Sequence, residues 1–254
     1  MMRNNRRFFL LFLGLCLLLT PAVPLQAADV ALPSIDLNFG SSSEPQDIAL
    51  SLQILALLTV LSLAPAFMIL ATSFTRIIVV LSFLRNALAT QQMPPNQVLV
   101  GLALFLTFFT MTPVWNEVYQ NALEPYFAGE MVQQEAITNA VTPIRAFMLR
   151  QTRDKDLALF VSFSDMDQPG SQDDLPMTVI IPAYAISELK TAFQIGFMLY
   201  LPFIVIDMVV ASVLMSMGMM MLPPMMISLP FKLILFILLD GWNLVVETLL
   251  STFA

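Results

Sequence analysis

The stretch MSMGMMMLPPMM runs from Met215 to Met226, and seven of its twelve residues are methionine. Pro223 and Pro224 stop a helix from running through it, because proline has no backbone N–H and disfavours helical geometry in the residue before it. Methionine side chains are unbranched and polarizable, so they repack against many shapes. The stretch therefore predicts a sharp bend that carries a deformable apolar surface. Composition leaves two interpretations open, an ordinary apolar turn or a soft seal around an opening.

Apolar segments lie on both sides of this bend, and two more precede them. The four segments are Ile48 to Ala71, Val98 to Trp115, Ala192 to Leu214 and Phe231 to Phe253. Each is about 20 residues long, which is the length that a helix needs to cross a bilayer. The chain is 58% hydrophobic and only 11% charged, with a mean hydropathy of +0.81, which lies outside the range of soluble domains. We therefore expect an all-α integral membrane protein with four helical spans.

Residues 1–27 have the layout of a cleavable signal peptide, in which several arginines precede the apolar run Phe8 to Leu19. That run is too short to span a bilayer. We expect cleavage after Ala27 and a short periplasmic lead-in, residues 28–47. Cys16 could instead indicate a lipoprotein, but the bulky leucine before it disfavours this interpretation. Because Cys16 is the only cysteine, the mature chain would form no disulfide.

Three further regions follow from the signal and the apolar segments. Residues 48–115 form a first apolar helical hairpin, residues 116–190 a periplasmic helical segment, and residues 191–254 a second apolar helical hairpin with the Met/Pro bend. The loop between the first two apolar helices then faces the cytoplasm, and so does the bend. Arg76 and Arg85, near that loop, agree with this orientation, because basic residues are enriched on cytoplasmic flanks.

The periplasmic segment carries an amphipathic pattern. Apolar residues recur at helical spacing from Ile137 to Met148, while charged residues between Arg145 and Asp156 occupy the opposite side. We therefore expect an amphipathic helix that packs on copies of the chain or on partners.

Ionisable residues inside the apolar helices are functional candidates, because a charge in a membrane segment is costly. Asp207 lies in the third segment, while Lys232 and Asp240 share the fourth, roughly 12 Å apart along a helix and too far for a direct pair. Glu188 and Lys190 are two positions apart and do not face each other. Their partners must come from another helix or another chain. The charges fit either structural ion pairs or a proton path, and Lys232 could instead extend to the membrane surface.

The composition disfavours several kinds of site. The chain has no histidine and a single cysteine, which argues against imidazole or thiolate metal sites, Ser/His/Asp triads and cysteine nucleophiles. An assembled conduit stays open, and so does an ion-coupled transporter with Asp207 and Asp240 as carriers. Such transporters are typically built from paired repeats of broken helices, and the sequence shows no repeat. We therefore favour the conduit and expect no enzymatic activity, metal or cofactor.

Six stretches resemble the FliP proteins of the bacterial flagellar type III export gate, and the resemblance extends over essentially all of the predicted mature chain. They are TSFTRIIVV (Thr72 to Val80), LRNAL (Leu84 to Leu88), PPNQVLVGLALFLTFF (Pro94 to Phe109), RAFMLRQTR (Arg145 to Arg153), PAYAISELKTAFQIGF (Pro182 to Phe197) and PFKLILFILLDGW (Pro230 to Trp242). The injectisome paralogue SctR shares much of this pattern. The long signal and the RAFMLRQTR stretch favour the flagellar branch. An injectisome protein is the first alternative, and an ion-coupled transporter the second.

The resemblance implies a core subunit of the export gate, located in the bacterial inner membrane at the flagellar basal body. It implies a homo-oligomer, a pentamer by the family pattern, assembled with FliQ and FliR beside FlhB and FlhA. Unfolded flagellar subunits would cross the membrane through this conduit, and no nucleic acid would be bound. The resemblance also implies that the helical hairpins form an oligomeric funnel, part of which stands above the bilayer.

The resemblance assigns roles to single residues as well. It places Met219, Met220 and Met221 in a methionine gasket at the constriction. It places Phe147, Arg153 and Phe160 at pore-facing or gate-stabilising positions. Contacts between subunits are implied for Glu188, Lys190 and Lys232, and we count Asp207 and Asp240 with these inter-subunit charges. The other four methionines of the bend keep the interpretation of an ordinary apolar turn.

Overall fold

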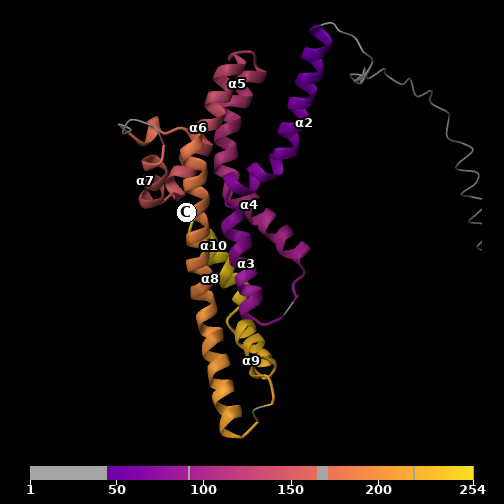
Figure 1. The fold of residues 1–254 in the computed structure, drawn as a ribbon, viewed down its shortest axis with the longest axis vertical. Coiled ribbons are helices and arrows are strands. Elements are labelled where there is room, and N and C mark those ends of the chain that lie inside the picture. Colours follow the sequence, from indigo (N-terminus) through magenta and orange to yellow (C-terminus); the bar gives the residue numbers. More distant parts are fainter. Residues whose placement is uncertain (1–44, 91, 165–170, 220, 254) are drawn as a thin grey trace, which may run out of the picture. The chain divides into compact units, whose positions relative to one another are not determined.

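The computed structural model describes residues 45–253 except 91, 165–170 and 220, and every regular element in that part of the chain is helical (Figure 1). The elements are α2 (Pro45–Ala71), α3 (Phe74–Ala87), α4 (Asn96–Val118), the π-helix η1 (Tyr119–Leu123), α5 (Glu124–Phe127), α6 (Gln133–Gln151), α7 (Asp154–Ser162), the 3-10 helix η2 (Gln172–Asp174), α8 (Met177–Ser216), α9 (Pro224–Leu238) and α10 (Gly241–Ser251). The predicted signal peptide and most of the lead-in lie outside the described residues. The expected all-α class is confirmed.

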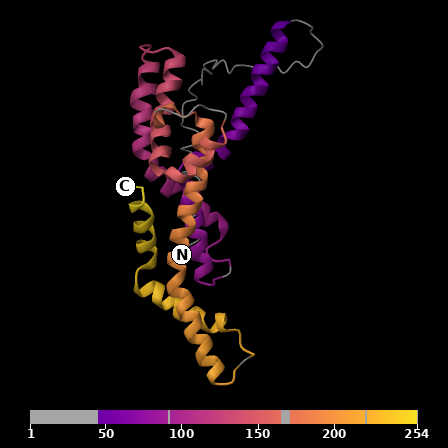
Figure 2. The ribbon, with the colours of Figure 1, turned by 60° about the vertical axis from the view of Figure 1, so that its left-hand side comes forward.

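The chain divides into two compact units, Met1–Gln53 and Ile54–Ala254. Of the first unit only the start of α2 is described, and the packing that follows belongs to the second. There α3 packs along α8 and α4, while α6 and α7 pack against the first half of α8 (Figures 1 and 2). The core of the second unit therefore follows α8.

Two uninterrupted helical stretches of the described chain are long and apolar enough to cross a membrane, Asn96–Phe127 and Met177–Ser216. Two further stretches meet the same criteria only as bent pairs. In α2 the bend is 45° and lies at Pro65, where the sequence predicted a break; between α9 and α10 the bend is 65°. The expected number of four spans is reached only if each bent pair counts as one span.

Helix α8 is longer than the sequence pattern indicated. Its 40 residues extend roughly 60 Å at 1.5 Å per residue. The pattern placed the start of this segment at Pro182, whereas the helix begins at Met177, because Pro176 already supplies its extended N-cap. Pro182 lies inside the helix, so it did not mark the start. The predicted limit between residues 190 and 191 falls within α8, and the predicted domain limits stay predictions.

The first core cluster joins α3 to α8, α4 and the C-terminal helices. Ile77, Val80, Leu81 and Leu84 of α3 are at most 1% exposed. They recur at i, i+3, i+4 and i+7, the spacing that places side chains on one face of a helix. This face packs against apolar residues of α4, α8, α9 and α10. The regular spacing explains why a short helix forms the centre of the cluster.

The second core cluster lies where α6 and α7 meet the first half of α8. Phe147 and Met148 of α6 are buried against Ile180 and Tyr184 of α8. The Tyr184 hydroxyl donates a hydrogen bond of 2.8 Å to the Thr72 carbonyl, in the break between α2 and α3. That carbonyl ends a helix and has no donor within it, so the bond satisfies a group that folding leaves open.

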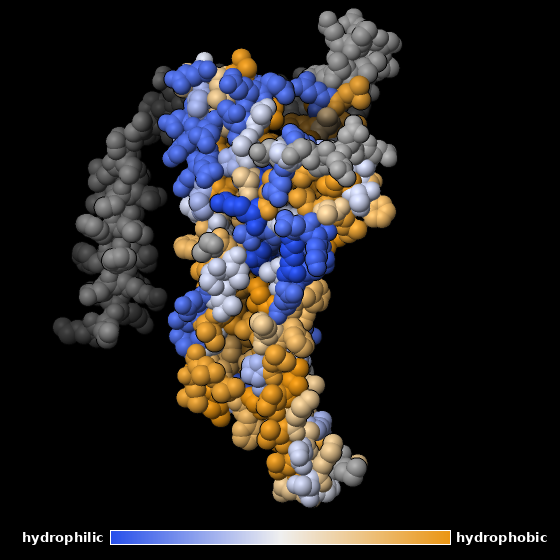
Figure 3. Space-filling model, turned by 90° about the vertical axis from the view of Figure 1, so that its left-hand side faces the viewer, coloured by the Kyte–Doolittle hydropathy of each residue, from blue (hydrophilic) through white to orange (hydrophobic). Residues whose placement is uncertain are grey.

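The surface of the second unit is divided by polarity. Figure 3 shows hydrophilic side chains over α6 and α7, and hydrophobic side chains over the second half of α8 and over α9. The exposed apolar residues include Met198, Met208, Ile237 and Leu238, each at least 66% exposed. Apolar surface of this extent is typical of contact with lipid or with other subunits.

Candidate functional site

The Met/Pro bend begins with an ordered turn at the end of α8. The Gly218 N–H donates to the Met215 carbonyl at 3.0 Å, and the Met219 N–H donates to the Leu214 carbonyl at 3.0 Å. These two bonds, with Gly218 at a φ of +76°, form the Schellman motif that ends many helices. Glycine is suited to this position because the left-handed backbone conformation strains residues that have a Cβ. The turn is therefore fixed at its start by a glycine.

The methionines of the bend differ in exposure. Met219 is 39% exposed, which fits its place in the Schellman motif, where this residue packs back on the last helical turn. Met221 is 98% exposed, and α9 begins shortly after it, with Pro223 as its N-cap. Met220 lies outside the described residues. The gasket role of these three methionines stays a prediction.

The remaining four methionines also point away from the core of the chain. Met215, Met217, Met225 and Met226 are between 61% and 69% exposed. They flank the turn on α8 and on α9, so the exposed thioether surface continues on both sides of the predicted gasket. The surface within one chain is therefore wider than the three residues that the resemblance assigned.

Lys232 and Asp207 form an ion pair within the chain. The Lys232 ammonium lies 2.7 Å from a carboxylate oxygen of Asp207, and it also donates to the Ala87 carbonyl at 3.0 Å. The Ser228 hydroxyl donates to the other Asp207 oxygen at 2.5 Å. The pair forms because the Met/Pro bend folds α9 back along α8. Since Lys232 is 1% exposed, it does not extend to a surface as one interpretation suggested.

Glu188 is paired with Arg76, a residue that sequence reasoning used only for orientation. The Arg76 guanidinium contacts both Glu188 carboxylate oxygens, with its Nε 3.0 Å from Oε2. A second Arg76 nitrogen donates to the Gln151 amide oxygen at 2.9 Å, which joins α3, α6 and α8. Glu188 and Arg76 are 0% and 2% exposed. Their separation of 112 positions explains why no local pattern revealed the pair.

Lys190 contacts Asp156, which the sequence did not single out either. The Lys190 ammonium is hydrogen-bonded to one Asp156 carboxylate oxygen, and the Ser187 hydroxyl donates to the other at 2.8 Å. The hydrogen bond from Lys190, followed by that from Ser187 and the positive charges of Lys190 and Arg153, lowers the pKa of Asp156 despite its burial. This group fastens the first turn of α7 to α8.

The residues assigned to the pore or the gate lie near this junction. The Phe147 ring is 4% exposed and packs beside Tyr184, with ring centroids 6.1 Å apart. Arg153 donates to the Thr191 hydroxyl and to the Gln194 amide oxygen. Phe160 is half-buried at the edge of the second core cluster. Burial of Phe147 within its own chain suits the gate-stabilising alternative, and all three roles stay predictions.

Asp240 differs from the other candidate charges. It is exposed and adopts a φ of +49° at the bend between α9 and α10, where it is the N-cap residue of α10. No ion pair of Asp240 is present among the residues that the structure describes. The other four charges have partners on other helices of the same chain, as one of the two expected origins required. Contacts of all five with another subunit stay a prediction.

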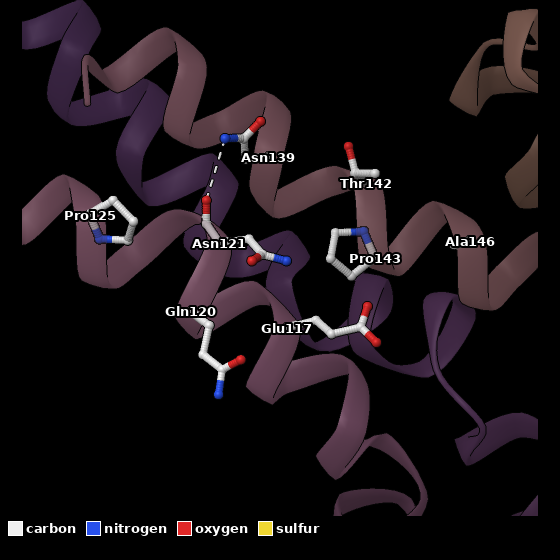
Figure 4. Close-up of a pocket in the computed structure, with 8 residues that line it drawn as sticks. All are labelled: Glu117, Gln120, Asn121, Pro125, Asn139, Thr142, Pro143 and Ala146. Atoms are coloured by element: carbon white, nitrogen blue, oxygen red, sulfur yellow. Dashed lines mark hydrogen bonds between the residues drawn. The ribbon is translucent and has the colours of Figure 1, made fainter. Parts of the chain in front are cut away.

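A groove of about 570 Å³ lies between η1 and α6 (Figure 4). Its wall contains a π-helix because Pro125 has no N–H to bond the Asn121 carbonyl four residues earlier. The Asn139 side chain donates to that carbonyl at 3.3 Å instead. Glu117 also lines the groove. Sequence analysis did not find this groove, because its walls come from two helices.

Comparison with known proteins gives consistent results. A model of the FliP family matches residues 57–249. The flagellar biosynthetic protein FliP of Bacillus subtilis is 59% identical over 217 residues, which are 85% of this chain and 98% of that protein. The protein of the same name from Pectobacterium carotovorum is 55% identical over 82% of this chain and 81% of its own length. That of Borreliella burgdorferi is 46% identical over 99% of this chain and 100% of its own.

Proposed function

The chain belongs to the FliP family, and on that premise we propose that it is a core subunit of the flagellar protein export gate. It is a component of the flagellar biosynthesis and export apparatus, and its apolar helices fit a place in the inner membrane at the basal body. The relatives named above are all flagellar proteins, which favours the flagellar interpretation over an injectisome protein. The proposal assigns no enzymatic step to the chain.

We propose further that copies of the chain form the conduit through which unfolded flagellar subunits pass. The observation that carries this step is the exposed methionine surface of the bend, where Met221 is 98% exposed at a turn that Gly218 fixes. Side chains of this kind adapt to varied shapes, so a ring of them could deform around a passing chain and close behind it. A fixed turn with mobile side chains suits such a seal.

Leakage measurements test the gasket. Replacing Met219, Met220 and Met221 by alanine shortens the side chains at the proposed constriction without removing Gly218. We expect the complex to assemble and the membrane to leak small ions or solutes more than wild type. The matched control replaces Met225 and Met226, which are equally apolar but lie on α9. Unchanged leakage from a fully assembled triple variant, or equal leakage from the control, would contradict the gasket.

The assembly is the second part of the proposal. We propose a homo-oligomer, a pentamer by the family pattern, that contains FliQ and FliR and works beside FlhB and FlhA. The large exposed apolar surface on α8 and α9 supports assembly with other subunits. The mass and subunit composition of the complex purified from membranes test this. A chain that purifies alone in a mild detergent, from cells that export normally, would contradict it.

A further inference from the structure

We propose that Arg76 is a positioning residue that fastens the end of α10, so that the C-terminal arm, defined as α9 and α10, is held at both of its ends. Arg76 lies in the first turn of α3, and its side chain is almost fully buried. Its pairing with Glu188 uses only part of its hydrogen-bonding capacity. The remaining contacts reach α10, which starts far from Arg76 in the sequence.

One Arg76 nitrogen, Nη1, contacts Thr252 twice. It donates to the Thr252 carbonyl at 3.2 Å and to the Thr252 hydroxyl at 3.0 Å. Thr252 is the C-cap of α10. Carbonyls at the end of a helix have no donor within it and carry a partial negative charge, so a buried guanidinium there satisfies both needs. Arg76 therefore caps α10 from another helix.

Phe253 completes the contact. The Arg76 guanidinium carbon lies 4.1 Å from the centroid of the Phe253 ring, a favourable arrangement for a cation and an aromatic face. The same ring stacks on Phe147 of α6, with centroids 6.5 Å apart and planes 22° from parallel. Phe253 packs against both core clusters. The end of α10 thus lies at the junction of the two clusters.

The other end of the arm is held by Lys232, which bonds the Ala87 carbonyl. Helix α3 therefore supplies both anchors, Arg76 near its start and Ala87 at its end, roughly 16 Å apart along the helix. The 65° bend at Asp240 lies between them. The methionine turn lies outside this held segment. Motion of the turn is then confined to residues 217–223 and does not pass into α10.

Testing this requires a variant that does not unfold the chain. Removing Arg76 alone would leave the Glu188 carboxylate buried without its partner, which is strongly destabilising in proteins. Arg76→Met combined with Glu188→Leu removes both charges, an exchange that buried ion pairs often tolerate. The double variant still loses every contact from Arg76 to Thr252 and Phe253. Arg76→Lys is the complementary variant, because it keeps a charge for Glu188 but lacks the planar fork that reaches Thr252.

Hydrogen–deuterium exchange of the purified full chain, together with the proteins that co-purify with it, gives the measurement. We expect the amides of α10 to exchange about tenfold faster in both variants, the factor expected from the loss of a charge-assisted hydrogen bond. Exchange in α4 should stay at the wild-type rate. Unchanged α10 exchange in either folded variant would overturn the proposal. A uniform rise in α4, α8 and α10 would overturn it as well, because Arg76 would then support the fold in general.

Two further variants separate the contributions. Phe253→Leu keeps the ion pair and removes the aromatic face, so it should accelerate exchange in α10 by a smaller factor. Asp156→Asn is the matched control, since it weakens a different polar contact of α8 and should affect α7 alone. Faster α10 exchange in the control equal to that of the double variant would contradict a specific role for Arg76. None of these measurements depends on export, so they can fail independently of the conduit.

Discussion

At the scale of single residues, Lys232 shows how a charge is kept in an apolar helix. Its ammonium has a carboxylate and a helix-end carbonyl as partners, and almost no water reaches it. Burying a charge without such partners is costly, whereas the same charge with them fixes which helices meet and in which register. Arg76 and Glu188 repeat this arrangement between α3 and α8. The buried charges therefore act first as connections between helices.

Replacing Lys232 by methionine tests this role. The variant leaves Asp207 and the Ala87 carbonyl without their donor, and because Asp207 is 30% exposed on its side chain we expect a loss of about 2–3 kcal/mol in the free energy of unfolding. Denaturant titration in detergent measures it. Lys190→Met is the control, since its side chain is 52% exposed and such pairs contribute at most about 1 kcal/mol. Equal losses in the two variants would contradict the assignment.

The Asp156 carboxylate gives a prediction about pH. Its pKa is lowered in the folded chain, chiefly by the hydrogen bond from Lys190. A group with a lowered folded pKa contributes stability above its unfolded pKa and loses that contribution as pH falls through the folded pKa. We therefore expect Asp156→Asn to be less stable than wild type at neutral pH, with the difference disappearing in acid below the ordinary aspartate range. Thermal unfolding of both proteins between pH 7 and strong acid checks this; a difference that grows toward low pH would contradict it.

At the scale of elements, the contact between α3 and α8 depends on a glycine. A Cβ at Gly196 would lie 2.6 Å from Cγ of Phe83, closer than real Cβ contacts allow. The Phe83 ring packs edge-on against Phe193, one turn before Gly196, with centroids 5.3 Å apart. The missing side chain therefore lets an aromatic ring of α3 lie against the backbone of α8. This is a packing requirement that no property of α8 alone reveals.

Substitution of Gly196 tests the requirement. We expect Gly196→Ala to cost about 1–3 kcal/mol, because overpacking forces the Phe83 ring to move. The measurement is the denaturant midpoint in detergent. Gly101→Ala is the control, since a Cβ there meets nothing within 4 Å, and it should be neutral or stabilise by up to about 1 kcal/mol. Combining Gly196→Ala with Phe83→Leu should recover part of the loss; an absence of recovery would show that Phe83 is not the cause.

At the scale of the whole molecule, the apolar helices separate into continuous and bent ones. Asn96–Phe127 and Met177–Ser216 each suffice to cross a bilayer, whereas α9 and α10 meet at 65° with the exposed carboxylate of Asp240 between them. A carboxylate within hydrocarbon is costly unless it is paired. The bend therefore argues that α9 and α10 do not cross the bilayer as one straight span.

Cysteine labelling tests the position of this bend. The only native cysteine, Cys16, lies in the predicted signal peptide, so a single introduced cysteine can be followed. We expect Asp240→Cys to react with a membrane-impermeant maleimide, because the bend should lie in contact with water. Val245→Cys, at a position 2% exposed, should stay unlabelled and serves as the control. Protection of both cysteines in intact and in opened membranes would place the bend inside lipid or protein.

The sequence by itself determined the helical class, the apolar segments and the family. These follow from composition, from the 3.6-residue period and from motifs that lie within single stretches, and each of those is a local property. The Met/Pro bend could be located for the same reason, since Pro223 and Pro224 end helices wherever they occur. The charges could be singled out as candidates, because a charge in an apolar segment is conspicuous without any structure.

Only the tertiary structure decided which partner each charge has and how far α8 extends. Glu188 meets Arg76 across 112 positions and Asp207 meets Lys232 across 25, and such pairs depend on how helices fold back on one another. The π-helix at Pro125 and the close approach at Gly196 likewise depend on a second helix. Spacing along the chain carries no information about these distances, because packing free energy selects them only when all the helices are present.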